Sequence, residues 1–342
     1  MTFTGASTDL RIADCHNDLL MAVLHQQERG HLDPFGDFWL PQLRSGGVVA
    51  QVLPIYTEDQ YVGEGALRRA LKMVHTAYDI ARRHSDDVAL VLTGQQLRSV
   101  IAQGRIALVL AIEGAEPVGP DLGIFHVLFR AGVRMASLTW NRRTIMADGV
   151  GETDTGGKLT SVGLAAIAEM EAIGMIVDVS HLSAAGFWHL MDHVSRPVVA
   201  SHSSVSSVYD HPRNLTDDQL RAIARAEGVV SLNAFGGFLS DRPTTADFLN
   251  HLDYAQGLIG PEHVALGTDF IGDVAEAVDP IFGGLMVDHS ALPLVPGLQR
   301  PADLSGLGVD MIERFGRPVA QTIAADALIG FLERNLPHEL PS

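Results

Sequence analysis

Short apolar runs alternate with longer helical patterns along the whole chain, and this alternation limits the fold more than any other feature of the sequence. We interpret eight runs rich in β-branched and apolar residues as strands: Arg11–Cys15, Val48–Pro54, Ile106–Ile112, Val133–Leu138, Met175–Val179, Val198–Ser201, Val229–Asn233 and Val264–Gly267. The main segments with helix-like periodicity are Gly65–Arg83, Val162–Ile173, Thr216–Ala226, Asp247–Ile259, Pro301–Phe315 and Pro318–Asn335. Strict alternation predicts a parallel sheet with helical crossovers, and eight strands are the number that closes an α/β barrel of the (β/α)8 TIM type.

An open doubly wound sheet shows the same alternation, so the turn after the first strand decides between the two folds. A dinucleotide-binding sheet carries a Gly-rich turn there, whereas this chain continues as Asp14-Cys15-His16-Asn17-Asp18. The sequence contains no internal repeat, long linker or low-complexity tract. We therefore expect one catalytic barrel domain over residues 1–342, with the irregular stretch Gly272–Pro296 as a loop over the barrel mouth.

The composition argues against several classes of partner. A formal net charge of −17 gives a surface that repels phosphate backbones and anionic lipid, so we expect no nucleic-acid and no membrane partner. Cys15 is the only cysteine, which rules out an internal disulfide and fits a reducing compartment. The segment Met1–Leu10 lacks a basic stretch followed by an apolar run, and no apolar run is long enough to span a bilayer. The expected location is therefore cytoplasmic.

Residues that bind metals follow the predicted strands at their carboxyl ends, where a barrel of this kind builds its active site. They are His16 and Asp18 after the first strand, Glu113 after the third, His181 after the fifth, His202 after the sixth and Asp269 after the eighth. Imidazoles and carboxylates together suit a pair of divalent ions. The share of imidazoles favours Zn²⁺, with manganese or cobalt as substitutes.

Each of these residues also has a simpler explanation. A single histidine at a strand end is usually a hydrogen-bonding cap. Asp18 or Asp269 alone could cap the following helix, and Glu113 alone could be a buried acid paired with an arginine. Placement on five different strand ends is hard to reach by chance and favours the metal site. Glu113 is the candidate for a bridging carboxylate, because the only two lysines, Lys72 and Lys158, do not end a predicted strand.

The motifs that contain these residues resemble those of the renal (membrane) dipeptidases, a branch of the amidohydrolase superfamily of barrels. The resemblance runs from Asp14 to about Asn335. Its carriers, in chain order, are Asp14-Cys15-His16-Asn17-Asp18, Ala111-Ile112-Glu113-Gly114, Val177-Asp178-Val179-Ser180-His181-Leu182-Ser183, Ala200-Ser201-His202-Ser203, His211-Pro212-Arg213-Asn214-Leu215 and Gly267-Thr268-Asp269-Phe270.

The resemblance implies a zinc-dependent dipeptidase with two metal ions and a small dipeptide as substrate, often with a D-residue at the C-terminal position. In this chain it implies that His16 and Asp18 hold one ion and that Glu113 bridges both. It implies further that His181 and His202 hold the second ion.

Two other positions take their roles from the same resemblance, and one position departs from it. Asp269 matches the family's general acid/base, and Arg213 matches the group that receives the substrate's C-terminal carboxylate. After the fourth strand, Trp140 stands where the family usually has a histidine that binds the scissile carbonyl oxygen. We expect Trp140 and Asn141 to line the substrate site. Asn141, Arg142 or a metal ion would then supply the stabilisation that the histidine gives elsewhere.

Two other functions stay open on the sequence. Another hydrolase of the superfamily, such as an N-acyl-D-amino-acid deacylase or a lactonase, needs the same metals but no free substrate α-amine. A metal-binding barrel that has lost catalysis would serve as a binding or scaffold protein, although Asp269 and all five ligand residues are present. Barrel hydrolases are often dimers, and the sequence leaves a homodimer open.

Overall fold

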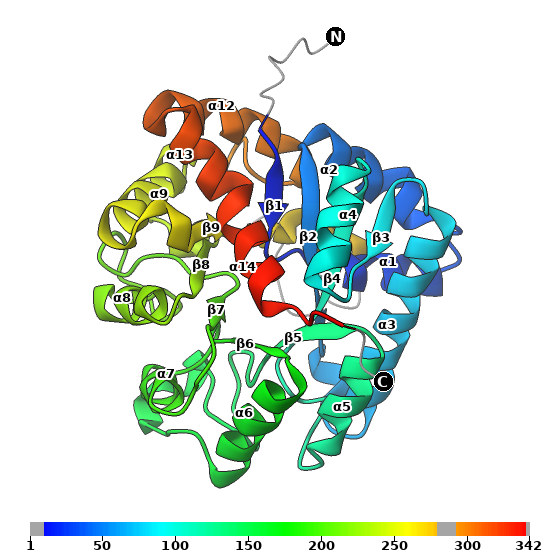
Figure 1. Ribbon diagram of the computed structural model, residues 1–342, viewed down its shortest axis with the longest axis vertical. Helices are drawn as coiled ribbons and strands as arrows, with labels where there is room; N and C mark the ends of the chain where they lie inside the picture. Colours follow the sequence, from blue (N-terminus) through cyan, green and yellow to red (C-terminus); the bar gives the residue numbers. More distant parts are fainter. Residues whose placement is uncertain (1–9, 279–291, 340–342) are drawn as a thin grey trace.

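Parallel strands form a closed ring in the computed structural model, which describes residues 10–278 and 292–339 (Figure 1). The ring strands are β1 (Ile12–Asp14), β2 (Val48–Tyr56), β4 (Ile106–Glu113), β5 (Val133–Ser137), β6 (Ile176–Asp178), β7 (Val199–Ala200), β8 (Val229–Leu232) and β9 (Val264–Leu266). Neighbouring strands pair in parallel, β2 pairs with β4, and β1 closes the ring by pairing with both β2 and β9. The predicted (β/α)8 barrel is confirmed.

One further strand, β3 (Val88–Leu90), lies beside the ring and is absent from the sequence prediction. It pairs with the first residues of β4, Ile106 to Leu108, whereas β5 pairs with β4 from Leu110 onward. β3 therefore extends the edge of β4 without entering the ring. A strand of three residues is too short to show an alternating pattern in the sequence.

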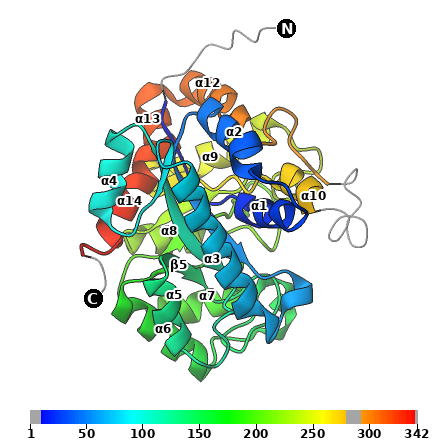
Figure 2. The same cartoon turned by 90° about the vertical axis from the view of Figure 1, so that its right-hand side faces the viewer.

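Helices surround the ring of strands (Figures 1 and 2). They are α1 (Leu19–Glu28), α2 (Leu40–Ser45), α3 (Gly65–Arg83), α4 (Gly94–Ala102), α5 (Gly123–Arg130), α6 (Ser161–Ile173), α7 (Ala184–Met191), α8 (Asp217–Arg225), α9 (Thr245–Ile259), α10 (Ile271–Val278), α12 (Leu304–Phe315), α13 (Arg317–Gln321) and α14 (Ala327–Asn335). Capping boxes begin α8 and α9, where the hydroxyls of Thr216 and Thr244 accept hydrogen bonds from the third residue of each helix. In the part of the chain that the structure describes, no helix is long and apolar enough to cross a membrane.

The prediction of a loop over Gly272–Pro296 is wrong for its first part. That part belongs to α10, which packs against α1. Gly272 and Asp273 obscured the helix in the sequence, but Val274 and Val278 are fully buried and provide its apolar face. Residues 279–291 of the predicted loop lie outside the described residues.

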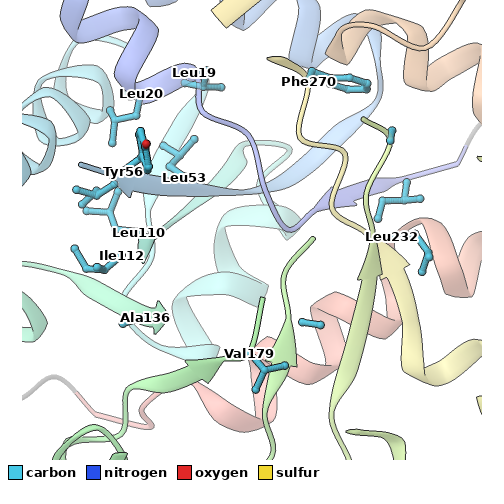
Figure 3. Close-up of a cluster of buried hydrophobic side chains, with 14 of the residues drawn as sticks. Leu19, Leu20, Leu53, Tyr56, Leu110, Ile112, Ala136, Val179, Leu232 and Phe270 are labelled. Carbon is cyan, nitrogen blue, oxygen red and sulfur yellow. The ribbon is translucent and has the colours of Figure 1, made fainter. Parts of the chain in front are cut away.

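The two faces of the strands pack into different clusters. On β4, Leu110 and Ile112 belong to the larger cluster, which includes side chains of the surrounding helices (Figure 3). Val109 and Ala111 alternate with them and belong to a second cluster, which includes Phe331 of α14. Both faces of the strands are thus covered by apolar side chains, as the unbroken apolar runs of the sequence require.

A buried ion-pair network fixes the chain after β2 to α1 and α3. Glu58 is fully buried, and its carboxylate accepts hydrogen bonds from Arg69 Nη2 at 2.6 Å and from Arg69 Nε at 3.0 Å. His25 Nε2 lies 2.9 Å from the same carboxylate. Burial alone would raise the pKa of Glu58, but His25 and Arg69 outweigh it and hold the pKa below its usual range. The segment that follows β2 is thereby held in one position at the barrel mouth.

Replacing Glu58 with glutamine should lower the free energy of unfolding by about 3 kcal/mol, because Arg69 would stay buried without its main counter-charge. Urea unfolding followed by circular dichroism measures this loss. Asp218→Asn is the control, since the Asp218 side chain is 81% exposed and its pair with Arg221 should contribute less than about 1 kcal/mol. Equal losses for the two variants would contradict the structural role of Glu58.

Candidate metal centre

The six residues predicted from the strand ends lie together at the carboxyl ends of the ring strands. All are buried except Asp269, whose side chain is 19% exposed. They are His16 and Asp18 after β1, Glu113 at the end of β4, His181 after β6, His202 after β7 and Asp269 after β9. They meet because parallel strands of a barrel all end on the same side.

The carboxylate of Glu113 lies between two groups of ligand atoms. Its Oε2 is 3.6 Å from His16 Nε2. Its Oε1 is 3.0 Å from His181 Nε2 and 3.5 Å from His202 Nε2. On the first side, His16 Nε2 is also 3.6 Å from Asp18 Oδ2. One oxygen therefore faces His16 and the other faces His181 and His202, which places the carboxylate between the imidazoles of the site.

The donor set fits divalent metal ions. Ligand atoms of His16, Glu113 and His202 all lie within 4.8 Å of one another, and those of His16, Asp18 and Asp269 do the same. His16 Nε2 and Asp18 Oδ1 are buried and have no hydrogen-bond partner among residues 10–278 and 292–339. Buried polar atoms are rarely left unpaired, so these two atoms point to a ligand that binds there. Imidazole nitrogens and carboxylate oxygens are ligands that zinc and related ions accept.

The charges of the site also favour a bound cation. Burial opposes protonation of His16, but three nearby carboxylates outweigh burial and raise its pKa to about 10. Burial and nearby positive charge lower the pKa values of His181 and His202 well below the ordinary histidine value. His181 and His202 are therefore neutral, which is the form of imidazole that binds metals. The carboxylates around His16 carry negative charge that a divalent ion would balance.

A hydrogen-bonded chain fixes the ring of His202. Ser201 Oγ donates to Asp178 Oδ2 at 2.5 Å, because a carboxylate can only accept. The same hydroxyl lies 2.7 Å from His202 Nδ1 and therefore accepts the Nδ1–H. This tautomer leaves the lone pair of His202 Nε2 free to face Glu113. Asp178 and Ser201 were not singled out from the sequence, although both lie in the motifs that carry the resemblance.

Asn141 fixes His181 in a similar way. Its Oδ1 accepts a hydrogen bond from His181 Nδ1 at 2.7 Å, so the proton lies on Nδ1 and His181 Nε2 carries the lone pair. The sequence suggested that Asn141 lines the substrate site. In the structure its carboxamide oxygen contacts a candidate ligand.

The backbone is strained at two site residues. Among the described residues other than glycine, only His181, Glu227 and Asp269 have positive φ angles, of 65°, 57° and 52°. Such conformations cost about 1–3 kcal/mol and need support from their surroundings. At Asp269 the support comes from Asp14, which accepts hydrogen bonds from the backbone N–H and the hydroxyl of the preceding Thr268, both at 2.8 Å. These hydrogen bonds hold the strained backbone in place, and the Asp269 carboxylate faces His16.

Asp269 has the environment of a group that exchanges protons near neutral pH. Burial is the main cause that raises its pKa to about 6, and the nearby carboxylate of Asp18 adds to it. Its Oδ2 accepts a hydrogen bond from Asn233 Nδ2 at 3.0 Å, and its Oδ1 lies 3.9 Å from His16 Nε2. Asn233, at the end of β8, was not singled out from the sequence. One carboxylate oxygen is thus held while the other faces the ligand atoms.

Arg213 lies beside the same cluster. Its Nη2 donates to the carbonyl oxygen of His202 at 3.0 Å and lies 3.2 Å from His181 Nε2. Its Nε is buried and has no hydrogen-bond partner among the described residues. Burial lowers the pKa of the guanidinium to about 10, so Arg213 stays charged at neutral pH. A cavity of about 200 Å³ is lined by Arg213, His181, Asp210 and neighbouring residues.

Trp140 stands at the edge of the cluster. Its ring lies 5.9 Å from the ring of His181 and 5.2 Å from that of Tyr56. Arg142 covers Trp140 at 5.4 Å, but each of the three guanidinium nitrogens of Arg142 already donates a hydrogen bond within the protein. Trp140 therefore packs beside Tyr56 and His181, and the guanidinium nitrogens of Arg142 face other protein groups.

Replacing Ser201 with alanine should weaken metal retention by about 10-fold or more, because His202 would lose the acceptor that fixes its tautomer. Competition with a chelator, followed by metal analysis, measures the change. Ser204→Ala is the control, because the Ser204 hydroxyl is equally buried but donates to the carbonyl oxygen of Asn233. If both variants retained metal equally, the hydrogen-bonded chain would have no role in metal binding.

Two curated relatives match part of the chain. A protein of Klebsiella pneumoniae, described as an uncharacterized protein in the pqqA 5′ region, is 40% identical over 182 residues, which are 49% of this chain and 66% of that protein. The dipeptidase verJ of Clonostachys rogersoniana is 34% identical over 210 residues, which are 60% of this chain and 54% of that protein. The matches thus cover less than two thirds of either relative.

A solved structure and a family model match over a longer range. The crystal structure of a metallo peptidase from Rhodobacter sphaeroides, liganded with a phosphinate mimic of the dipeptide L-Ala-D-Ala, is 26% identical with a TM-score of 0.82. The match covers 95% of this chain and 99% of that one. The model of the membrane dipeptidases (peptidase family M19) matches residues 5–280. With a barrel of this topology and these residues at its strand ends, the chain belongs to the membrane dipeptidase family.

Proposed function

We propose that this protein is a metal-dependent dipeptidase that hydrolyses the peptide bond of dipeptides, including those with a D-residue at the C-terminal position. The observation that carries the proposal is the carboxylate of Glu113, which has one oxygen facing His16 Nε2 and the other facing the Nε2 atoms of His181 and His202. The similarity to the Rhodobacter sphaeroides metallo peptidase, which binds a mimic of L-Ala-D-Ala, supports the substrate class.

In this proposal two divalent ions, with zinc favoured, occupy the centre. His16 and Asp18 would hold one ion, His181 and His202 would hold the other, and Glu113 would be their shared ligand. Such ions would supply Lewis acidity, which polarises a carbonyl and lowers the pKa of a water from about 16 towards about 7.

Asp269 acts as general acid/base. It takes a proton from the attacking water and passes it to the amine that leaves, which is most efficient when its pKa lies near the operating pH. Its pKa of about 6 suits both steps near neutral pH. The hydrogen bond from Asn233 holds the carboxylate in one orientation while the proton moves.

Arg213 binds the C-terminal carboxylate of the dipeptide. A guanidinium offers two parallel N–H donors to a carboxylate, which fixes the orientation of the substrate as well as its affinity. The unpartnered Nε and the cavity beside Arg213 support this role. Trp140, which lies next to His181, bounds the space for the remainder of the substrate.

The Asp269→Asn variant should keep its metal ions and lose about 10²- to 10⁴-fold in kcat, because the amide cannot take up the proton. Dipeptide hydrolysis and metal analysis on the same sample measure the two quantities. Asp310→Asn, at an exposed position on α12, is the control for the loss of one carboxylate. Retained activity in Asp269→Asn would remove Asp269 from the proton transfer.

The proposed function is tested by the hydrolysis of L-Ala-L-Ala, L-Ala-D-Ala and N-acetyl-D-Ala by zinc-reconstituted protein, with metal-stripped protein as the control. We expect metal-dependent cleavage of the dipeptides, and in particular of the L,D isomer. Cleavage of N-acetyl-D-Ala alone would replace the proposal by a deacylase. If none of the three substrates were hydrolysed while two metal ions were bound, Trp140 would belong to a site for another substrate.

A further inference from the structure

Arg142 joins three segments at the barrel mouth. It lies in the loop after β5, and its Nε donates to Glu116 Oε1, after β4, at 2.7 Å. Its Nη2 donates to the carbonyl oxygen of Thr57, and its Nη1 to Asp59 Oδ1, at 2.6 and 2.5 Å. Both of these partners follow β2. Only 22% of the Arg142 side chain is exposed. Its bonds therefore tie the ends of three strands together.

The partners of Arg142 are themselves held in place. The Glu116 side chain is 7% exposed and pairs with no second cation among the described residues, so Arg142 is its counter-charge. Thr57 and Asp59 lie on either side of Glu58, which the buried pair with Arg69 fixes to α3. Arg142 thus connects the loop after β5 to parts of the structure that are fixed independently.

The two residues before Arg142 contact a candidate metal ligand. Asn141 accepts the hydrogen bond from His181 Nδ1, and the Trp140 ring lies 5.9 Å from the His181 ring. The guanidinium of Arg142 lies over the indole of Trp140, with Cζ 5.4 Å from the ring centroid. Arg142 is therefore linked to His181 in two ways: through the indole of Trp140, which lies between them, and through the neighbouring residue Asn141, which accepts the hydrogen bond.

We propose that Arg142 is a positioning residue that holds Trp140 and Asn141 against His181, and so fixes the orientation of this ligand and the wall of the substrate site. The inference rests on the proposed function only in its kinetic consequence. A planar fork with donors in three directions suits acceptors that lie on separate segments, whereas the ammonium group of a lysine is a compact point charge. Arg142→Lys should therefore keep part of the positioning of Trp140 and Asn141, and Arg142→Gln should lose it.

Arg143 offers a matched control. It follows Arg142 in the same loop and also pairs with a carboxylate, that of Asp148, with Nη2 at 3.0 Å from Oδ2. Its side chain is 55% exposed, and within the described residues it pairs with Asp148 rather than with Trp140 or Asn141. Arg143→Gln removes the same charge from the same loop without affecting the path to His181.

The experiment compares Arg142→Gln, Arg142→Lys and Arg143→Gln with the parent protein by tryptophan emission and by metal retention against a chelator. Neither readout needs a substrate, so a failure of the dipeptidase proposal leaves this test intact. The variants are repeated in a Trp140→Phe background, because the chain has two other tryptophans, Trp39 and Trp188. Where dipeptides are cleaved, kcat and KM are measured as well.

We expect Arg142→Gln to shift the emission to longer wavelength and to weaken retention of one metal ion by about 10-fold or more. The emission shift should vanish in the Trp140→Phe background, and Arg143→Gln should change neither readout. If Arg142→Gln does not fold, Arg142→Lys carries the test with a smaller change in the same direction. Emission and metal retention equal to those of Arg143→Gln, in whichever Arg142 variant folds, would overturn the proposal.

Discussion

The burial of three carboxylates at one end of the barrel is the constraint on which the rest of the site depends. Asp18, Glu113 and Asp269 lie around the imidazole of His16 at 3.6, 3.6 and 3.9 Å. Two like charges 4 Å apart repel by about 4 kcal/mol at an effective dielectric constant of about 20. Arg213 and the protonated His16, whose pKa is raised to about 10, add two positive charges, which do not balance three negative ones. A divalent cation would supply the remainder, and the unpartnered His16 Nε2 and the carboxylate of Glu113 are the atoms at hand to bind it.

Two further buried carboxylates hold the strand ends in the geometry that the ligands need. Asp14 accepts hydrogen bonds from Thr268 and so joins the end of β1 to the end of β9. Asp178 accepts from the backbone and hydroxyl of Ser201 and joins β6 to β7. Hydrogen bonds inside a buried, low-dielectric site are electrostatically stronger than those exposed to water. The hydrogen bonds to Asp14 and Asp178 offset the backbone strain at His181 and Asp269, the two site residues with positive φ angles.

The fold and the ligand candidates could be predicted because both follow from local patterns. Apolar runs give the strands, and parallel strands bring their carboxyl ends together, so His16 and Asp269 meet although more than 250 residues separate them. Other features depend on contacts that no local pattern encodes. The strand β3 is too short for a pattern, and α10 is recognisable only from its packing against α1. The link from Asp178 through Ser201 to His202 depends on side-chain directions that only the folded chain defines.

Arg213 and Arg142 show most clearly what the sequence could not decide. Both follow strands of the barrel, both lie near His181, and on sequence alone either could bind substrate. The structure separates them by the acceptors that surround each guanidinium. Arg142 has a protein partner for every nitrogen, whereas the buried Nε of Arg213 has none among the described residues and a cavity lies beside it. A free donor next to a cavity favours ligand binding, because its desolvation is compensated only when a ligand arrives. A fully bonded guanidinium instead stabilises the loop that carries it.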